Sequence, residues 1–220
     1  MSDDSQAVTT QRSTVEDWTQ ALAQSVGSPG GGAGAGVMLA IAASLASMVA
    51  GYTEADGHEQ RELAEIHARV RSLRQTALRL ADEDASASRN FGAAFRLDPG
   101  PEREEAIHRA SVDAAKASAV LGERAIDAIA DLEWLAAKGN PALVADVVVA
   151  LGALRAAVTG ARTNVSFDLA ALTSAGRTPD QIREEQPALW RTVESLDNAV
   201  DRIDRLTAEV NHRSAPDGAD

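Results

Sequence analysis

Apolar residues recur every three or four positions along most of the chain, which is the spacing of one face of an α-helix. The longest run extends from Gln60 to Phe95, a second from Glu102 to Lys138, and a third from Pro141 to about residue 172. Strict alternation of apolar and polar residues, which is typical of β-strands, occurs nowhere. The pattern therefore predicts an all-α protein.

Shorter helices are predicted near both ends of the chain. Ser13 and Glu16 have the spacing of a capping box, so a helix is expected to begin at Ser13 and to stop at Gly27. Its apolar stripe consists of Val15, Trp18, Leu22 and Val26. Near the C-terminus, Thr178-Pro179 marks the start of a short helix, and the apolar stripe of a last amphipathic helix extends from Leu189 to Val210.

The residues KGNP, at positions 138–141, predict that one helix stops and the next begins. Gly139 is expected in a left-handed conformation at the helix end, with Asn140 as the N-cap of the next helix and Pro141 at its first position.

The helix after KGNP has one face of small residues. These are Ala150, Ala153, Ala157 and Gly160. Asp146 and Asn164 lie at the two ends of this face, about 27 Å apart along a helix. One copy of the chain cannot bring these two side chains to one site, but two antiparallel copies packed on the small face could.

Composition refines the prediction to a single-domain bundle of long antiparallel helices. Aromatic residues make up only 3% of the chain, so the core must consist largely of Ala, Leu and Val, whose size lets helices approach closely. We expect residues 13–172 to form the helical domain and residues 173–213 to form a helical extension packed on it. Residues 1–12 and 214–220 are expected to be disordered.

Charge and composition disfavour several classes of partner. The net charge of -12 argues against nucleic acid, because binding a phosphate backbone requires clustered Lys and Arg. The acidic start, MSDDSQ, does not resemble an export signal, and a chain without cysteine fits a cytoplasmic protein. Residues 33–50 are long enough to span a membrane, but Ala, Gly and Ser dominate them. We therefore expect a buried helix there, and no membrane partner.

Asp84 lies on the stripe of the 60–95 helix that should be buried. An unpaired buried carboxylate is costly, so it should have a raised pKa or a donor partner. Alternatively, the stripe drifts and leaves Asp84 at a wet edge beside Asp82 and Glu83. In the first case Asp84 is a candidate general acid or base.

The glycine-rich stretch SPGGGAGAG, residues 28–36, follows the first predicted helix. No Lys-Ser or Lys-Thr follows it, as a P-loop requires, and a helix precedes it where a dinucleotide-binding fold has a strand. Two compatible interpretations remain. The amides at the N-terminus of the next helix can hold an anion, and the glycines permit close helix packing.

Metal-binding signals are weak. The four histidines, His58, His67, His108 and His212, are scattered and lack the paired spacing of a zinc site, so no metal is expected. Lys138 stands beside the KGNP turn, where it is either a ligand-binding cation or a solvated cation favoured at a helix C-terminus.

Four stretches carry a family resemblance: TVEDWTQALAQSVGSPGGGAGAG, LADEDASAS, AAKGNPALVADV and ARTNVSFDL. In this order they resemble the formimidoyltetrahydrofolate cyclodeaminase and methenyltetrahydrofolate cyclohydrolase family over about residues 13–172. The resemblance implies an all-α fold, a tight homodimer and a site near the subunit interface. It also implies a small-molecule substrate, which is a tetrahydrofolate derivative, and no metal.

Members of that family either close a formimino group onto a second folate nitrogen with loss of ammonia, or open the methenyl bridge with water. Both reactions need a base that assists a weak nucleophile and an acid that protonates the departing nitrogen. The resemblance implies that Asp84 and Asp146 are the catalytic carboxylates. It places substrate binding at Gly30, Gly31, Gly32, Lys138, Asn140, Asn164 and Asp168.

The sequence also departs from the family pattern. Ala33 and Ala145 stand where the family usually has serine, and Asp168 stands where it has asparagine. The turn at residues 51–60 contains no lysine, whereas the family turn is rich in lysine. The loss of cations bears most directly on the binding of a polyanionic folate tail.

Three functions are therefore compatible with the sequence. The first is a folate cyclodeaminase or cyclohydrolase. The second is a repurposed cyclase or ammonia-releasing lyase that acts on a smaller, less anionic substrate. The third is a non-catalytic dimeric helical protein that binds a ligand or a partner.

Overall fold

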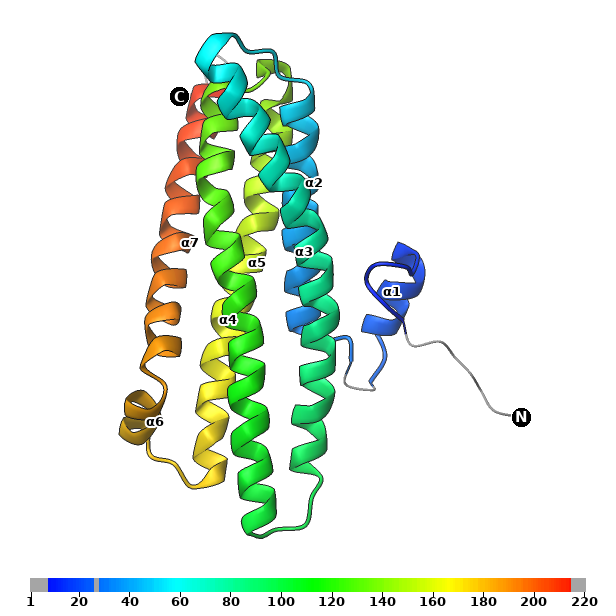
Figure 1. The fold of residues 1–220 in the computed structure, drawn as a ribbon, viewed down its shortest axis with the longest axis vertical. Coiled ribbons are helices and arrows are strands. Elements are labelled where there is room, and N and C mark those ends of the chain that lie inside the picture. The colour runs from blue at the N-terminus through cyan, green and yellow to red at the C-terminus, as the bar shows by residue number, and fades with distance from the viewer. Residues whose placement is uncertain (1–7, 26–27, 215–220) are drawn as a thin grey trace, which may run out of the picture.

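The computed structural model describes residues 8–25 and 28–214, and these residues form helices and no strand (Figure 1). The long helices are α2 (Gly31–Gly51), α3 (Gly57–Phe95), α4 (Pro101–Lys138), α5 (Val144–Ala171) and α7 (Pro187–Ser214). The short elements are α1 (Val15–Leu22), α6 (Pro179–Glu185) and two 3-10 turns, η1 (Pro141–Leu143) and η2 (Leu172–Ala175). The prediction of an all-α bundle of long antiparallel helices is confirmed.

The long helices enclose one main core. In Figure 1, α3 and α4 lie in front of α2 and α5, and α7 flanks them on one side. α2 packs on α3 and α5, and α5 also packs on α4 and α7. Each of the five long helices contributes buried aliphatic side chains to the core, among them Leu39, Ile66, Leu132, Leu154 and Ile203.

Small residues let α2 approach its neighbours closely. A Cβ added to Gly36 would lie 2.7 Å from the Cβ of Ala81 on α3, and a Cβ added to Gly160 would lie 2.9 Å from the Cβ of Ala35. The small face of α5 therefore packs on α2 of the same chain. The idea that two antiparallel copies pack on this face is wrong, because α2 already covers it.

Two segments, Gly31–Gly51 and Pro141–Ala175, are long and apolar enough to span a membrane by length and composition alone. Core helices pass the same test, and more than half of the apolar window in the first segment is buried inside the bundle. The first segment is thus buried to the extent expected of a core helix.

The first helix begins one residue later than predicted. Thr14, and not Ser13, is the N-cap, and its hydroxyl accepts the backbone N–H three residues on. Ser13 instead accepts a hydrogen bond from the backbone N–H of Thr9. The helix ends at Leu22, before the predicted stop at Gly27, which lies outside the described residues. Val26 of its predicted apolar stripe also lies outside the described residues, and of the three described members Trp18 is buried whereas Val15 and Leu22 are exposed.

The turn between α4 and α5 differs from the prediction in its glycine. Gly139 has extended backbone angles, with φ -69° and ψ 173°, so it is not left-handed. A Cβ there would lie 2.3 Å from the carbonyl oxygen of Leu135, so glycine is required by close approach. Asn140 caps the next element, accepting the N–H of Ala142 at 3.0 Å, and Pro141 starts a 3-10 turn rather than an α-helix.

The N-terminal segment is held against α3. The backbone N–H of Thr10 donates to Asp82 at 2.7 Å, and the indole N–H of Trp18 donates to the Thr10 hydroxyl at 3.1 Å. Residues 8–12, expected to be disordered, are therefore anchored through Thr10, whereas residues 1–7 lie outside the described residues.

Candidate active site

Asp84 lies on α3 beside the first turn of α2. A Cβ added to Gly32 would lie 2.1 Å from Oδ1 of Asp84 and 2.4 Å from its Cγ. The carboxylate therefore occupies the space that a side chain at position 32 would need. Glycine at this position lets an acid from α3 reach the N-terminus of α2.

Burial raises the pKa of Asp84. Hydrogen bonds from the backbone N–H of Ala33 and from the hydroxyl of Ser118 on α4 partly offset this effect, because they stabilise the ionised carboxylate. The structure thus supports the first of the two interpretations of Asp84, a partly buried acid with donor partners, over a wet edge.

Asp168 is a second acid at the same place. It is half-buried on α5, and its burial and the charge of Asp84 together raise its pKa to about 7. Two carboxylates that interact in this way titrate as a pair, since ionising both is unfavourable. Because the pKa of Asp168 is about 7, Asp168 holds its proton up to near neutral pH and can donate it there.

The structure brings several other predicted residues toward this pair. Gly30 is the N-cap of α2, and Gly31 and Gly32 form its first turn. Asn164 lies one turn before Asp168 on the same face of α5. We expected the amides at the start of α2 to hold an anionic part of a ligand, and the amide that follows this glycine run already binds Asp84.

Lys138 and Asn140 lie at the other end of the bundle. The Lys138 ammonium bonds to Glu59 at 2.9 Å and lies 5.7 Å from the centre of the Trp134 ring. The Asn140 side chain donates to the carbonyl of Tyr52 at 3.0 Å. A cavity of about 440 Å³ opens between the end of α2 and this turn.

Asp146 lies in the first turn of α5, at the same end of the bundle as Lys138 and Asn140. It precedes Asp168 by 22 residues, which is about 33 Å along a helix. Within one chain, then, the predicted pairing of Asp84 with Asp146 is not formed. Asp168, which we had predicted to bind substrate, takes the place of the second carboxylate.

Ser118 is the residue that sequence reasoning missed. It is 4% exposed on α4 and donates to Asp84. Its only signal in the sequence is a hydroxyl among the small apolar residues of a core stripe. The pattern of that stripe does not indicate which acid Ser118 contacts.

Among the described residues, no group of three or more His, Asp or Glu side chains is arranged to hold a metal ion. The candidate site presents the paired carboxylates, the Ser118 hydroxyl and the first turn of α2.

Comparison with known proteins adds an independent result. A sequence model of the formiminotransferase-cyclodeaminase family matches residues 14–187. Methenyltetrahydrofolate cyclohydrolase of Methylorubrum extorquens is 26% identical over 179 residues, which cover 78% of this chain and 86% of that protein. A crystal structure of formiminotetrahydrofolate cyclodeaminase from Thermotoga maritima is similar in fold, with a TM-score of 0.73 at 24% identity. The match covers 91% of this chain and 98% of that one.

Proposed function

Since the chain belongs to the formiminotransferase-cyclodeaminase family, we propose that it is a folate one-carbon enzyme of the cyclodeaminase or cyclohydrolase type. The names of its relatives support a tetrahydrofolate derivative as the substrate. The observation that carries the proposal is the pair of partly buried acids, Asp84 and Asp168, at the first turn of α2.

Both possible reactions use one ionised and one protonated carboxylate. In the hydrolytic reaction, water adds to the bridging carbon and the carboxylate accepts a proton from that water. The carboxylic acid then protonates the folate nitrogen whose bond to carbon breaks, and the new hydroxyl group releases its proton to solvent as it becomes the formyl carbonyl. In the deaminating reaction, a folate nitrogen adds to the carbon of the protonated formimino group, which becomes an amino group, and the folate nitrogen loses its proton to the carboxylate. The acid then protonates the amino group, which leaves as ammonia.

The two acids divide these roles by their surroundings. The donors around Asp84, from Ala33 and Ser118, favour its ionised form, so Asp84 is the base. Burial and the charge of Asp84 raise the pKa of Asp168 to about 7, which favours its protonated form. Asp168 is therefore the acid. Asn164 lies within reach of the same space on α5 and orients the substrate by hydrogen bonds.

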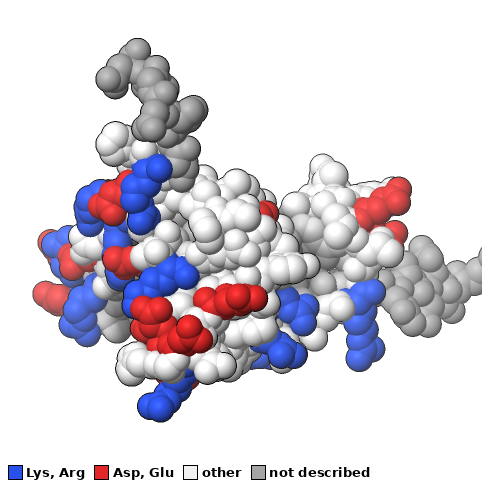
Figure 2. Space-filling view, turned by 90° about the horizontal axis from the view of Figure 1, so that it is seen from above, with Lys and Arg blue, Asp and Glu red and all other residues white. Residues whose placement is uncertain are grey.

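A homodimer is part of the proposal. The outer faces of α2 and α5, with Tyr52 capping the end of α2, expose large apolar side chains, namely Met38, Ile41, Met48, Tyr52, Val149 and Phe167. α2 contains no charged residue. Figure 2 shows charged side chains along the left and lower parts of the view and again at its right, with a wide uncharged area between them. Exposed apolar surface of this kind is typical of subunit interfaces.

Such an interface would border the carboxylate pair, because Phe167 directly precedes Asp168. An antiparallel second copy on this outer face would bring the end that carries Lys138 and Asn140 beside the pair of the other copy. The predicted site residues near Asp84 and those near Lys138 would then contribute to one site.

Turnover of two substrates tests the proposal. Hydrolysis of 5,10-methenyltetrahydrofolate is followed by absorbance, corrected for the spontaneous reaction, and ammonia release is measured with 5-formimidoyltetrahydrofolate. We expect turnover of at least one. Asp84→Asn should abolish it while circular dichroism shows an intact fold, and Asp113→Asn, at an exposed position on α4, should retain it. Wild-type protein that neither turns over nor binds either folate in calorimetry would contradict the proposal.

A second candidate function is a cyclase or ammonia-releasing lyase of the same fold with a less anionic substrate. The observation that favours it is the shortage of available cations at the Lys138 end. The turn at 51–60 contains no lysine, and Lys138 is engaged by Glu59. In that case, smaller formimino compounds release ammonia and folates do not. In a non-catalytic binding protein, Asp84→Asn changes only the melting temperature.

A further inference from the structure

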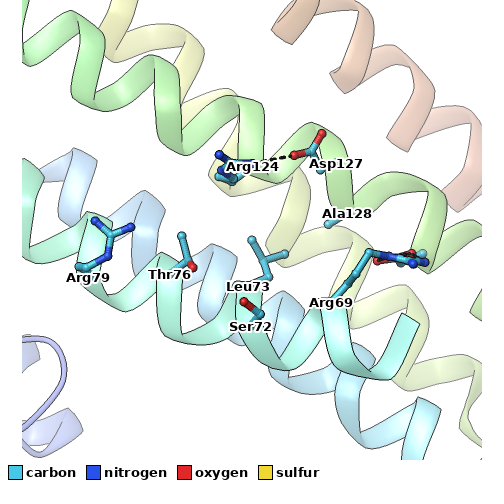
Figure 3. Close-up of a pocket in the computed structure, with 9 residues that line it drawn as sticks. Arg69, Ser72, Leu73, Thr76, Arg79, Arg124, Asp127 and Ala128 are labelled. Atoms are coloured by element: carbon cyan, nitrogen blue, oxygen red, sulfur yellow. Dashed lines mark hydrogen bonds and ion pairs between the residues drawn. The ribbon is translucent and has the colours of Figure 1, made fainter. Parts of the chain in front are cut away.

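A groove of about 410 Å³ lies between α3 and α4, apart from the carboxylate pair (Figure 3). All of its lining residues belong to these two helices. Its volume falls in the range of small-molecule sites in proteins. The proposed function leaves this groove without a role.

The wall formed by α3 is rich in hydrogen-bond donors. Arg69, Ser72, Thr76 and Arg79 follow one another at spacings of three, four and three residues, which puts them on one helix face. In Figure 3 their side chains project from α3 toward the space below α4. The two arginines are ten residues apart, about 15 Å along the helix. No acid of α3 lines the groove.

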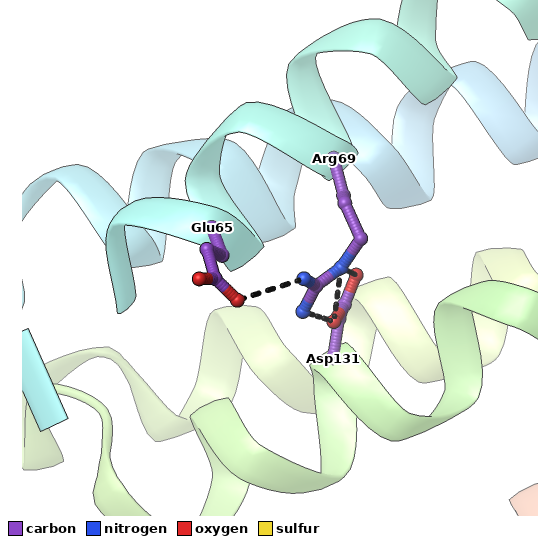
Figure 4. Close-up of polar contacts among 3 residues, drawn as sticks. All are labelled: Glu65, Arg69 and Asp131. Carbon is purple, nitrogen blue, oxygen red and sulfur yellow. Dashed lines mark hydrogen bonds and ion pairs between the residues drawn. The ribbon is translucent and has the colours of Figure 1, made fainter. Parts of the chain in front are cut away.

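One end of the groove is built around a buried acid. Asp131 on α4 is 7% exposed. The Arg69 guanidinium donates two hydrogen bonds to its Oδ1, from Nη2 at 2.6 Å and from Nε at 3.2 Å (Figure 4). Glu65 lies on the other side of the same guanidinium, at 3.8 Å. Because Asp131 is neutralised and Arg69 is held in place, this end of the groove is preorganised.

The other two arginines pair with exposed acids. Arg79 pairs with Glu83, and Arg124 on α4 lies 3.5 Å from Asp127. All four side chains are more than half exposed. Exposed pairs of this kind contribute little to stability, so a bound anion can replace either carboxylate at small cost. The lining contains three arginines and two aspartates, and Glu65 and Glu83 pair with two of the arginines from outside the lining.

We propose that this groove binds an organic anion through its carboxylate or phosphate groups. Arg79 and Arg124 bind the anionic groups, and the hydroxyls of Ser72 and Thr76 line the space between. Guanidinium groups pair with carboxylate and phosphate in the same two-pronged geometry, so the two ligand classes share one recognition chemistry. The site is independent of the catalytic proposal, because none of its residues belongs to the cluster around Asp84.

Binding of two simple probes to the full-length protein tests this inference. Inorganic phosphate and glutarate are titrated separately at low salt, with backbone amide NMR and calorimetry as readouts. We expect saturable binding of at least one probe, with the largest shifts at residues 69–79 and 124–131. The probe that binds more tightly identifies the ligand class as phosphate or carboxylate.

Charge-matched variants decide whether the groove is the site. Arg79→Gln and Arg124→Gln should each weaken binding about tenfold, the effect of losing one charge-assisted hydrogen bond. Arg74→Gln removes the same charge from an exposed position on α3 outside the groove and should bind like the wild type. Equal weakening in all three variants would show a net-charge effect and overturn the assignment. Failure of both probes to saturate would overturn it too, whatever the folate assays show.

Discussion

Asp168→Asn should stabilise the protein more at pH 8 than at pH 5. Burial and the charge of Asp84 raise the pKa of Asp168 from its ordinary value of 3.8 to about 7. The unfolded chain therefore releases this proton near pH 4, whereas the folded protein retains it to about pH 7. Between these values the folded state binds more protons, so the free energy of unfolding of the wild type falls as pH rises and levels off above pH 7.

The size of the pH-dependent stability difference depends on how far pH 5 lies below the folded-state pKa of Asp168. About two pKa units lie between pH 5 and the folded-state pKa of Asp168, which corresponds to about 2.7 kcal/mol at most. Asp168 is only half-buried, and solvent screening reduces the value. Asparagine has a similar shape and no charge, so it removes the penalty. We expect the stability gain from Asp168→Asn at pH 8 to exceed the gain at pH 5 by about 1.5 kcal/mol.

Urea unfolding followed by circular dichroism at the two pH values measures this difference. Protein concentration is held fixed, because subunit association would add to the apparent stability. Asp113→Asn, at an exposed position on α4, is the control and should show the same small effect at both pH values. An Asp168→Asn effect that does not depend on pH, or a loss of stability at pH 8, would refute the reasoning.

The remaining predictions concern close contacts in the bundle. Gly32→Ala would place a Cβ 2.1 Å from Asp84, so kcat should fall. The control is Gly34→Ala, whose Cβ meets nothing within 4 Å. This variant should keep the wild-type kcat and raise stability by about 0.5–1 kcal/mol. Equal kcat in the two variants would argue against the site. Gly122→Ala forces a Cβ to within 2.7 Å of a leucine of α7 and should cost about 1–3 kcal/mol in urea unfolding, unlike Gly34→Ala. Asp131→Asn removes the charge of a buried acid that pairs with the half-exposed Arg69 and should lower stability by about 1–3 kcal/mol. An unchanged melting temperature would show that the pair contributes nothing.

The long helices could be predicted because each buries a continuous stripe. The run at 60–95 corresponds to α3 at Gly57–Phe95, and the run at 102–138 corresponds to α4 at Pro101–Lys138. Asp84 was identifiable for the same reason, since it interrupts an otherwise apolar stripe. Helix ends were less predictable: Ser13 and Thr14 can both serve as N-caps, and the choice depends on contacts with the segment before them.

The partners of Asp84 could not be predicted, because they come from separate helices. Ser118 and Asp168 reach Asp84 only through the packing of α4 and α5 on α3 and α2, and no spacing in the sequence encodes that packing. The small face of α5 illustrates the same limit. A row of alanine and glycine indicates close packing, but the contact between Gly160 and Ala35 is what shows that the neighbour is α2.

The pH dependence of kcat tests the central claim most directly, namely that Asp84 and Asp168 act together as base and acid. With 5,10-methenyltetrahydrofolate as substrate, we expect kcat of the wild type to fall on the alkaline side as Asp168 loses its proton near pH 7. Asp168→Asn should lose most of the rate together with that limb of the profile. A wild-type profile without a limb near pH 7, or a variant with the wild-type rate and profile, would contradict the claim.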